Sequence, residues 1–309
     1  MKPSILQLCP LMPHLEAALA ERFDIHRFFE TDAAVPGEQA ASIRGVVTGG
    51  HIGIPATLAA QLPALEIVAI NGVGFDKVDL GEAKRRGVRV SNTPDVLTED
   101  VADLAIGLVI ALLRQLALGD RHVREGRWPA GDLGLGHKVS RRRYGIFGLG
   151  RIGLAIARRL EGFDAEIHYA SRSARDVAYP RHETLVELAA ACDVLIVAAA
   201  ASAETRHVID RSVLDALGPK GVLVNVARGS LIDEAALLDA LREGRIAGAA
   251  LDVFADEPHV PEAFFALPNV VLTPHMASAT HETRQAMADL VLANLDAHFA
   301  GRELPTALV

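Results

Sequence analysis

Three glycines at fixed spacing are the first residues of this sequence that indicate a chemical function. The motif consists of Gly148, Leu149, Gly150, Arg151, Ile152 and Gly153. An apolar run, Tyr144 to Phe147, precedes it, and a helical segment, Leu154 to Leu160, follows it. In such a strand-turn-helix unit the glycines permit a tight turn, backbone approach to a pyrophosphate, and close packing of helix on strand. The helix N-terminus favours the anion. The motif therefore predicts a dinucleotide site, with an ordinary glycine turn as the alternative.

The residues after the next apolar run bear on which dinucleotide is bound. That run, Ala165 to Tyr169, is followed by Ser171, Arg172 and Ser173. Ser171 stands 18 residues after Gly153 (171 − 153), close to where an NAD site usually places an acidic residue for the ribose 2′-hydroxyl. An arginine flanked by hydroxyls is suited instead to a 2′-phosphate. We therefore expect NADPH (NADP) to be preferred, with NAD(H) still possible and a solvated loop arginine as the alternative.

Composition limits the classes of protein to which the chain can belong. Its 309 residues are half hydrophobic and 23% charged, which suffices for two cores of ordinary size. The formal net charge is -8, and Lys and Arg are scattered along the chain, so nucleic acid is not an expected partner. The only cysteines, Cys9 and Cys192, are too few for a disulfide framework. We expect both to be small core residues.

The sequence predicts a cytoplasmic protein without a membrane partner. The residues after Met1 and Lys2 read as a first strand and not as a signal peptide. The longest apolar stretch, Val101 to Leu113, is interrupted by Asp103 and is shorter than the roughly 20 residues that span a bilayer.

Two series of short apolar runs, separated by helical segments, predict the strands. The first series is Ile5 to Leu8, Ile25 to Phe28, Val46 to Thr48, Ile67 to Ile70 and Val88 to Ser91. The second is Tyr144 to Phe147, Ala165 to Tyr169, Val194 to Ala199, Val222 to Val226, Ala247 to Leu251 and Val270 to Thr273. This alternation is typical of the α/β class with doubly wound parallel sheets.

We expect two such domains, a Rossmann dinucleotide-binding domain inserted into a flavodoxin-like substrate domain. The predicted bounds are 99–283 for the dinucleotide-binding domain, with 1–98 and 284–309 forming the substrate domain because the last helix, about His281 to Ala300, crosses back onto it. A long helical stretch, Thr98 to about Arg124, is apolar on nearly every face. We interpret it as a hinge element buried between domains or subunits.

Four motifs in this order resemble one family across essentially the whole chain. They are the glycine motif Gly148 to Gly153, then Asn225-Val226-Ala227-Arg228-Gly229, then Leu251-Asp252-Val253-Phe254-Ala255-Asp256-Glu257-Pro258, then Thr273-Pro274-His275. The sequence resembles the D-2-hydroxyacid dehydrogenase family, and within it the NADPH-dependent glyoxylate and hydroxypyruvate reductases. The resemblance implies reduction of small 2-keto acids to D-2-hydroxy acids by a homodimeric enzyme.

The resemblance implies that Arg228, Glu257 and His275 are the catalytic residues, and the chemistry explains these types. Arginine donates a forked pair of hydrogen bonds that anchors the substrate carboxylate and polarises its ketone. Histidine titrates close enough to neutrality to give the alkoxide a proton. A carboxylate on the other ring nitrogen fixes the tautomer and favours the charged imidazole.

Further residues are implied only by the same resemblance. The cofactor would be lined by Thr98, Ala199, Val226, Ala227, Asp252 and Ser278. Among these, Asp252 would hold the nicotinamide carboxamide. The substrate loop would be Asn71, Gly72, Val73 and Gly74, whose glycines let N–H groups turn inward as an anion nest.

Some features leave alternatives open. Met276-Ala277-Ser278 stands where many family members have a glycine. In related reductases a partner tryptophan covers the substrate, and the context of Trp128 does not assign it that role. The histidines lack metal-ligand spacing, so no metal site is expected. Bulkier keto acids such as aryl pyruvates, or a non-catalytic dinucleotide-sensing regulator on the same fold, are the competing functions.

Overall fold

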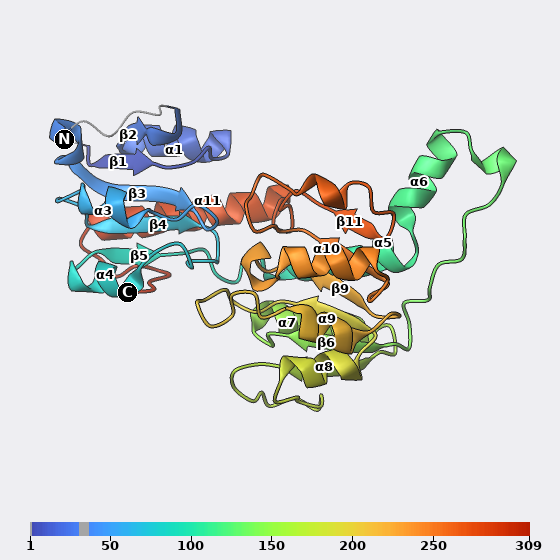
Figure 1. Ribbon diagram of the computed structural model, residues 1–309. Helices are drawn as coiled ribbons and strands as arrows, with labels where there is room; N and C mark the ends of the chain where they lie inside the picture. The colour runs from blue at the N-terminus through green and yellow to red at the C-terminus, as the bar shows by residue number, and fades with distance from the viewer. Residues whose placement is uncertain (1, 31–36) are drawn as a thin grey trace. The chain divides into compact units, whose positions relative to one another are not determined.

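A computed structural model describes residues 2–30 and 37–309 of the chain. They form two compact units, the first from the described residues within Met1–Leu97 and Ala279–Val309, and the second from Thr98–Ser278. Each unit is built around one sheet, of five strands in the first and six in the second, and all strand pairs in both are parallel. The predicted α/β class with two parallel sheets is therefore confirmed (Figure 1).

The first unit has the strand order β2-β1-β3-β4-β5. Its elements are β1 (Ser4–Gln7), α1 (Pro13–Arg22), β2 (Asp24–Arg27), η1 (Phe28–Glu30), α2 (Gly37–Ala40), β3 (Ile43–Gly49), α3 (Ala56–Ala60), β4 (Ile67–Asn71), α4 (Leu80–Arg85), β5 (Arg89–Ser91) and α11 (His281–Phe299). Neighbouring residues of β3 face opposite sides of the sheet. Val46 lies in a core cluster with Leu58 of α3, whereas Val47 lies in one with Leu19 of α1 and Leu295 of α11. Both faces are thus covered, as a parallel sheet requires.

The second unit has the strand order β11-β10-β9-β8-β6-β7. Its elements are α5 (Thr98–Leu113), α6 (Leu116–Arg124), η2 (Trp128–Ala130), β6 (Arg143–Phe147), α7 (Arg151–Glu161), β7 (Glu166–Ala170), α8 (Leu185–Ala191), β8 (Val194–Val197), α9 (Arg211–Leu217), β9 (Val222–Asn225), η3 (Gly229–Leu231), α10 (Glu234–Arg242), β10 (Gly248–Leu251), η4 (Glu262–Phe264) and β11 (Val270–Leu272). The helices α8, α9 and α10 cover one face of the sheet (Figure 1). The helices α5 and α7 contact each other and the strands.

The prediction of one long helix from Thr98 to Arg124 is wrong in one respect. The structure has two helices there, α5 and α6. Gln115 between them adopts a left-handed conformation, φ +54°, which ends the first helix. One side of α5 is buried, including Val101 and Val109. In α6, all of whose residues the structure describes, no side chain is buried. Burial along the whole stretch is therefore not found within this chain.

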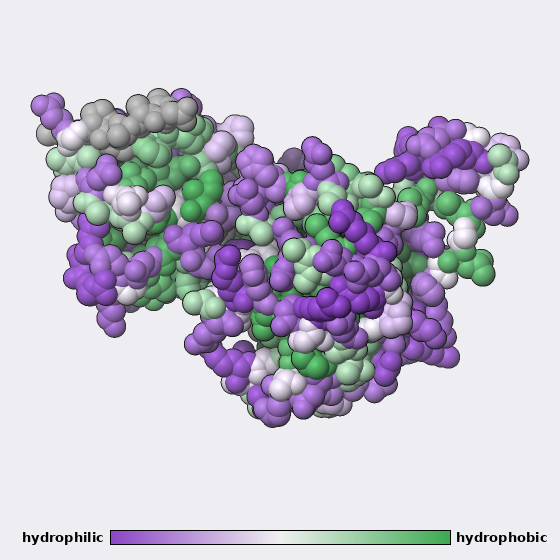
Figure 2. All heavy atoms as spheres, in the orientation of Figure 1, coloured by the Kyte–Doolittle hydropathy of each residue, from purple (hydrophilic) through white to green (hydrophobic). Residues whose placement is uncertain are grey.

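Apolar side chains lie exposed on α6 and the segment after it, which extend away from the sheet of this unit (Figure 1). They are Leu116, Val123, Trp128, Leu133 and Leu135. Figure 2 shows hydrophobic residues interspersed with hydrophilic ones along this segment. We call residues 116–135 the arm. Among the described residues, no single helix meets the length and hydropathy of a membrane span; α5 and α6 meet them only together, across a 61° bend.

Candidate active site

The glycine loop leaves β6 and enters α7 in the way that the motif predicts. Gly148 has φ +96°, and a Cβ added there would lie 2.4 Å from the backbone of Ala199, which follows β8. A Cβ at Gly153 would lie 2.2 Å from the carbonyl oxygen of Gly148. At Gly150, the N-cap of α7, a Cβ would meet no atom of the described residues within 4 Å. The first and third glycines are thus required by packing, and the second leaves backbone open to an anion at the helix N-terminus.

The Ser171-Arg172-Ser173 loop lies beside the glycine loop. It follows β7, which pairs with β6, and Gly148 donates a backbone hydrogen bond to Ala170 at 2.8 Å. Ser171 Oγ donates to the carbonyl of Ser173 at 2.6 Å, and Arg172 is exposed. The side chain of Arg181 also reaches the carbonyl of Ser171, at 3.4 Å. Arg181 is paired with Glu183 at 2.9 Å, so Arg172 is the guanidinium group at this strand end that could receive an anionic group.

Arg228 is held in a turn at the carboxyl end of β9. The fully buried side chain of Asn225 accepts from the N–H of Ala227 at 3.0 Å and donates to the carbonyl of Arg228 at 2.9 Å. The guanidinium donates to the carbonyl of Ala227 at 2.7 Å. The predicted cofactor residues Val226 and Ala227 lie in this turn. Parallel sheets bind ligands at this edge.

His275 and Glu257 form a close pair in the loops that follow β11 and β10. His275 Nδ1 lies 2.6 Å from Glu257 Oε2, and the side chains are 32% and 17% exposed. Glu257 Oε1 accepts from the N–H of Phe254 at 2.9 Å. Because Nδ1 is engaged by the carboxylate, Nε2 is the ring nitrogen suited to exchange a proton with a bound molecule.

Asp252 organises the loop that carries His275. Its carboxylate is fully buried; Oδ1 accepts from Thr273 Oγ1 at 2.6 Å and from the N–H of Met276 at 2.9 Å, and Oδ2 accepts from the N–H of Ala277 at 3.0 Å. The N–H of His275 donates to the Asp252 carbonyl at 2.8 Å. His275 is thereby held at φ +49°, a conformation that non-glycine residues adopt only where their surroundings impose it. A nicotinamide contact for Asp252 stays a prediction.

The remaining predicted residues are divided between the two units. Thr98 and Ser278 stand at the two ends of the second unit. Asn71, Gly72, Val73 and Gly74 belong to the first unit, at the carboxyl end of β4. Trp128 lies in the arm, 62% exposed, with Nε1 donating to Asp132 at 3.0 Å.

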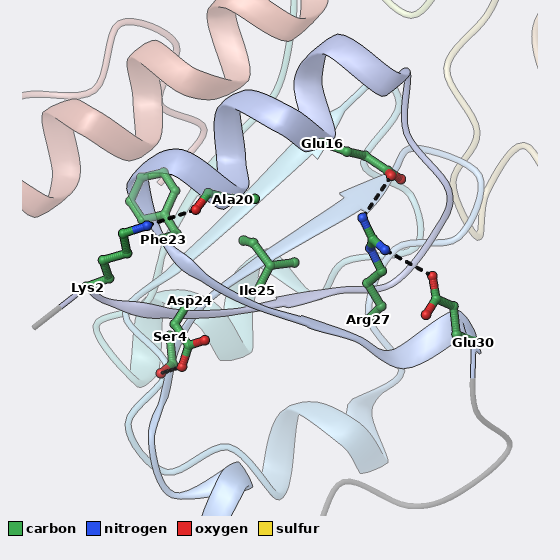
Figure 3. A pocket seen from close by; sticks show the side chains of 9 residues that line it. All are labelled: Lys2, Ser4, Glu16, Ala20, Phe23, Asp24, Ile25, Arg27 and Glu30. Atoms are coloured by element: carbon green, nitrogen blue, oxygen red, sulfur yellow. Dashed lines mark hydrogen bonds and ion pairs between the residues drawn. The ribbon is translucent and has the colours of Figure 1, made fainter.

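A concave surface between α1 and β2 of the first unit is lined by other residues (Figure 3). Lys2 there donates to the carbonyl of Ala20 at 2.9 Å, and Arg27 lies 3.2 Å from Glu16 and 3.4 Å from Glu30. Its cationic groups are therefore engaged by this chain's own oxygens. Within the described residues, no group of three or more His, Cys, Asp or Glu side chains is placed to hold a metal ion.

Comparison with known proteins decides the family. Residues 106–277 match the model described as D-isomer specific 2-hydroxyacid dehydrogenase, NAD binding domain. The chain is 53% identical over 308 residues to a glyoxylate/hydroxypyruvate reductase of Arabidopsis thaliana, covering 99% of this chain and 98% of that protein. The chain belongs to the D-isomer specific 2-hydroxyacid dehydrogenase family. The predicted family and enzyme class are thus confirmed.

Two further relatives of this dehydrogenase differ in the substrate they are named for. A hydroxyphenylpyruvate reductase of Plectranthus scutellarioides is 52% identical over 308 residues, with 99% of this chain and 98% of that one covered. The solved structure of an NADPH-dependent glyoxylate/hydroxypyruvate reductase from Sinorhizobium meliloti, in complex with NADP and malonate, matches with a TM-score of 0.95 at 47% identity, covering 100% of this chain and 97% of that one.

Three residues that shape the dehydrogenase's site were given no role by the sequence interpretation. Asn225 braces the Arg228 turn, Thr273 donates to Asp252, and Glu234 accepts from the N–H of Ala255 at 2.8 Å in the loop before Glu257. Burial raises the pKa of the Glu234 carboxyl. Asn225 had a detectable signal, since it is a polar residue in an otherwise apolar strand run. The other two act through residues 21 positions away, which no local pattern indicates.

Proposed function

We propose that the protein reduces glyoxylate and hydroxypyruvate, with NADPH preferred as the hydride donor. The observation that carries the proposal is the 2.6 Å pair of His275 and Glu257, which lies in the same unit as Arg228 and the glycine loop. The names of the Arabidopsis thaliana and Sinorhizobium meliloti relatives support the substrate class. A bound NADPH supplies the hydride that reaches the keto carbon.

The residues of this chain perform the remaining steps of the proposed reaction. Arg228 binds the carboxylate and carbonyl oxygen of the keto acid through its forked donors. His275, protonated, transfers a proton from Nε2 to the oxygen that becomes the hydroxyl. Glu257 holds the ring by Nδ1 and stabilises its positive charge until the proton has left. The keto acid gains one hydride and one proton, and the product is a 2-hydroxy acid. The product of glyoxylate has no stereocentre, and that of hydroxypyruvate has the D configuration that the family name indicates.

NADPH preference rests on the residues at the end of β7. Arg172 is flanked by the hydroxyls of Ser171 and Ser173, and no carboxylate stands among these three positions. The 2′-phosphate of NADPH gives a guanidinium group a charged acceptor that NADH lacks. NADH remains a weaker donor in this account.

A bulkier keto acid is the second candidate substrate. The 52% identity to the hydroxyphenylpyruvate reductase of Plectranthus scutellarioides favours it. NADPH consumption should be followed with glyoxylate, hydroxypyruvate and 4-hydroxyphenylpyruvate in turn, and repeated with NADH. The proposal predicts a higher kcat/KM for the two small acids and for NADPH. Turnover of the aryl substrate alone would replace it with the second candidate, and turnover of none would refute both.

We also propose that the enzyme is a homodimer whose contact includes the arm. Leu135 is 95% exposed and Trp128 is 62% exposed, and association with a second subunit would remove these large apolar side chains from water. A two-fold dimer would cover the same patch on both subunits. Light scattering should give twice the chain mass of 32.9 kDa, and the single-chain mass at micromolar protein would refute the dimer.

A further inference from the structure

Two peptide groups of the loop after β4 are fixed through their carbonyl oxygens. The side chain of Asn92 donates from Nδ2 to the carbonyl of Val73 at 2.8 Å. The backbone N–H of Thr93 donates to the carbonyl of Gly72 at 2.9 Å. Both acceptors therefore point toward the segment that follows β5.

The direction of these carbonyls determines the direction of two N–H groups. In a trans peptide unit the C=O and N–H bonds point in opposite directions, and these units are trans. The N–H of Val73 shares a unit with the carbonyl of Gly72, and the N–H of Gly74 shares one with the carbonyl of Val73. Within residues 2–30 and 37–309, neither N–H donates to another group of the chain. Two neighbouring N–H groups that point away from residues 92 and 93 can receive one carboxylate.

Asn92 is itself held by a buried polar network of the first unit. Thr306 Oγ1 donates to the Asn92 carbonyl at 2.6 Å, and the Asn92 N–H donates to the Thr306 carbonyl at 3.4 Å. Asn294 of α11 donates from Nδ2 to Thr306 Oγ1 at 2.8 Å and accepts from the Thr306 N–H at 3.1 Å. Asn92 is 6% exposed and Asn294 is 1% exposed.

Such a network restricts Asn92 to one position. Breaking the hydrogen bonds of buried polar groups costs free energy, so the two bonds to Thr306 hold the backbone of Asn92 in place. The strand-like segment 306–309 reinforces this position, because Ala307 bridges Ser91 and the Leu308 N–H donates to Val90 at 2.7 Å.

We propose that Asn92 is a positioning residue that aims the N–H of Gly74 at the carboxylate of the keto acid, and that Thr306 holds Asn92 in place. The N–H of Val73, which the backbone of Thr93 orients, is the second donor to that carboxylate. The inference rests on the proposed function, because it takes residues 71–74 as the carboxylate site. It adds residues from β5, α11 and the segment after α11 to the determinants of substrate affinity. None of them touches the substrate in this proposal.

The test separates substrate affinity from turnover. Asn92→Ala and Thr306→Val should each raise the KM for glyoxylate by roughly five- to tenfold, the scale of one neutral hydrogen bond. The kcat and the dissociation constant of NADPH should stay within about twofold, since neither residue acts on the proton or the cofactor. The dissociation constant of oxalate from the enzyme–NADPH complex, measured by calorimetry, should rise by the same factor as KM.

Two variants serve as controls. Thr306→Ser keeps the hydroxyl and should restore the wild-type KM. Thr283→Val removes another threonine hydroxyl of the first unit, one that donates to the carbonyl of Val96 at 3.1 Å, and should leave KM and oxalate binding unchanged.

The outcomes distinguish this inference from the proposed function. Unchanged KM and oxalate binding in Asn92→Ala, beside an active wild type, would overturn the inference and leave the function standing. Equal losses in kcat and NADPH binding would also overturn it, because they indicate general damage. A wild type that binds oxalate without reducing any keto acid would refute the function, while the oxalate measurement on the variants would still decide the positioning role.

Discussion

Gly229 lies directly against the backbone of Phe254. A Cβ added at Gly229 would stand 1.9 Å from the carbonyl carbon of Phe254 and 2.3 Å from the nitrogen of Ala255. The two loops that meet here carry Arg228 and Glu257 respectively. Their spacing, and with it the relative placement of two catalytic candidates, therefore depends on the absence of a side chain at this one position.

Gly229→Ala should damage stability and catalysis together. Backbone atoms cannot move aside as a flexible side chain can, so the loops must separate, and overpacking of this kind costs about 1–3 kcal/mol. We expect a lower urea midpoint and a reduced kcat/KM for glyoxylate. Gly107→Ala in α5 is the matched control from the same unit, because among the described residues a Cβ there meets nothing within 4 Å. Wild-type stability and activity in Gly229→Ala would show that the loop contact is unimportant.

Arg172→Ala should change the preference between cofactors. Only NADPH carries a 2′-phosphate, so loss of charge-assisted hydrogen bonds should weaken NADPH binding by roughly ten- to hundredfold and leave NADH almost unaffected. Arg141→Ala removes an exposed arginine near the amino end of β6 and should alter neither constant. Dissociation constants from fluorescence titration provide the measurement, and equal weakening of both cofactors by Arg172→Ala would refute the assignment.

The two cysteines should be unreactive in the folded protein. Both are free and buried, as the sequence predicted, and burial raises the pKa of Cys9 to about 11 and that of Cys192 to about 12. A raised pKa keeps each sulfur protonated at pH 8, whereas the thiolate is the nucleophile. A thiol reagent at pH 8 should therefore label neither until denaturant is added. Rapid labelling of the native enzyme would contradict this burial.

Glu257→Gln should narrow the pH range of reduction. The amide still accepts a hydrogen bond from the ring, but the negative charge that stabilises imidazolium is gone. Because the imidazolium form donates the proton in reduction, the alkaline limb of kcat/KM should move downward. A pH series with glyoxylate and NADPH measures the limb. An unchanged limb would mean that another group supplies the proton.

Short sequence patterns were enough to predict the strands and the glycine turn, because these depend on residues close together in the sequence. The apolar runs located the strands, and Gly148 and Gly153 located the turn because their close backbone contacts exclude any side chain. The break at Gln115 had no such signal, since glutamine rarely adopts positive φ. Contacts between distant residues were also missed: Thr306 reaches Asn92 across 214 positions. A hydrogen bond of that span depends on the folded chain and leaves no periodicity in the sequence.

The turnover of His275→Ala tests the central claim most directly. If His275 delivers the proton, kcat for glyoxylate reduction should fall by roughly 10² to 10⁴, the usual contribution of a positioned general acid. The dissociation constant of NADPH and the thermal midpoint should stay near the wild-type values, because the imidazole is partly exposed and acts on the substrate. Near-normal kcat in a folded, NADPH-binding His275→Ala enzyme would contradict the account.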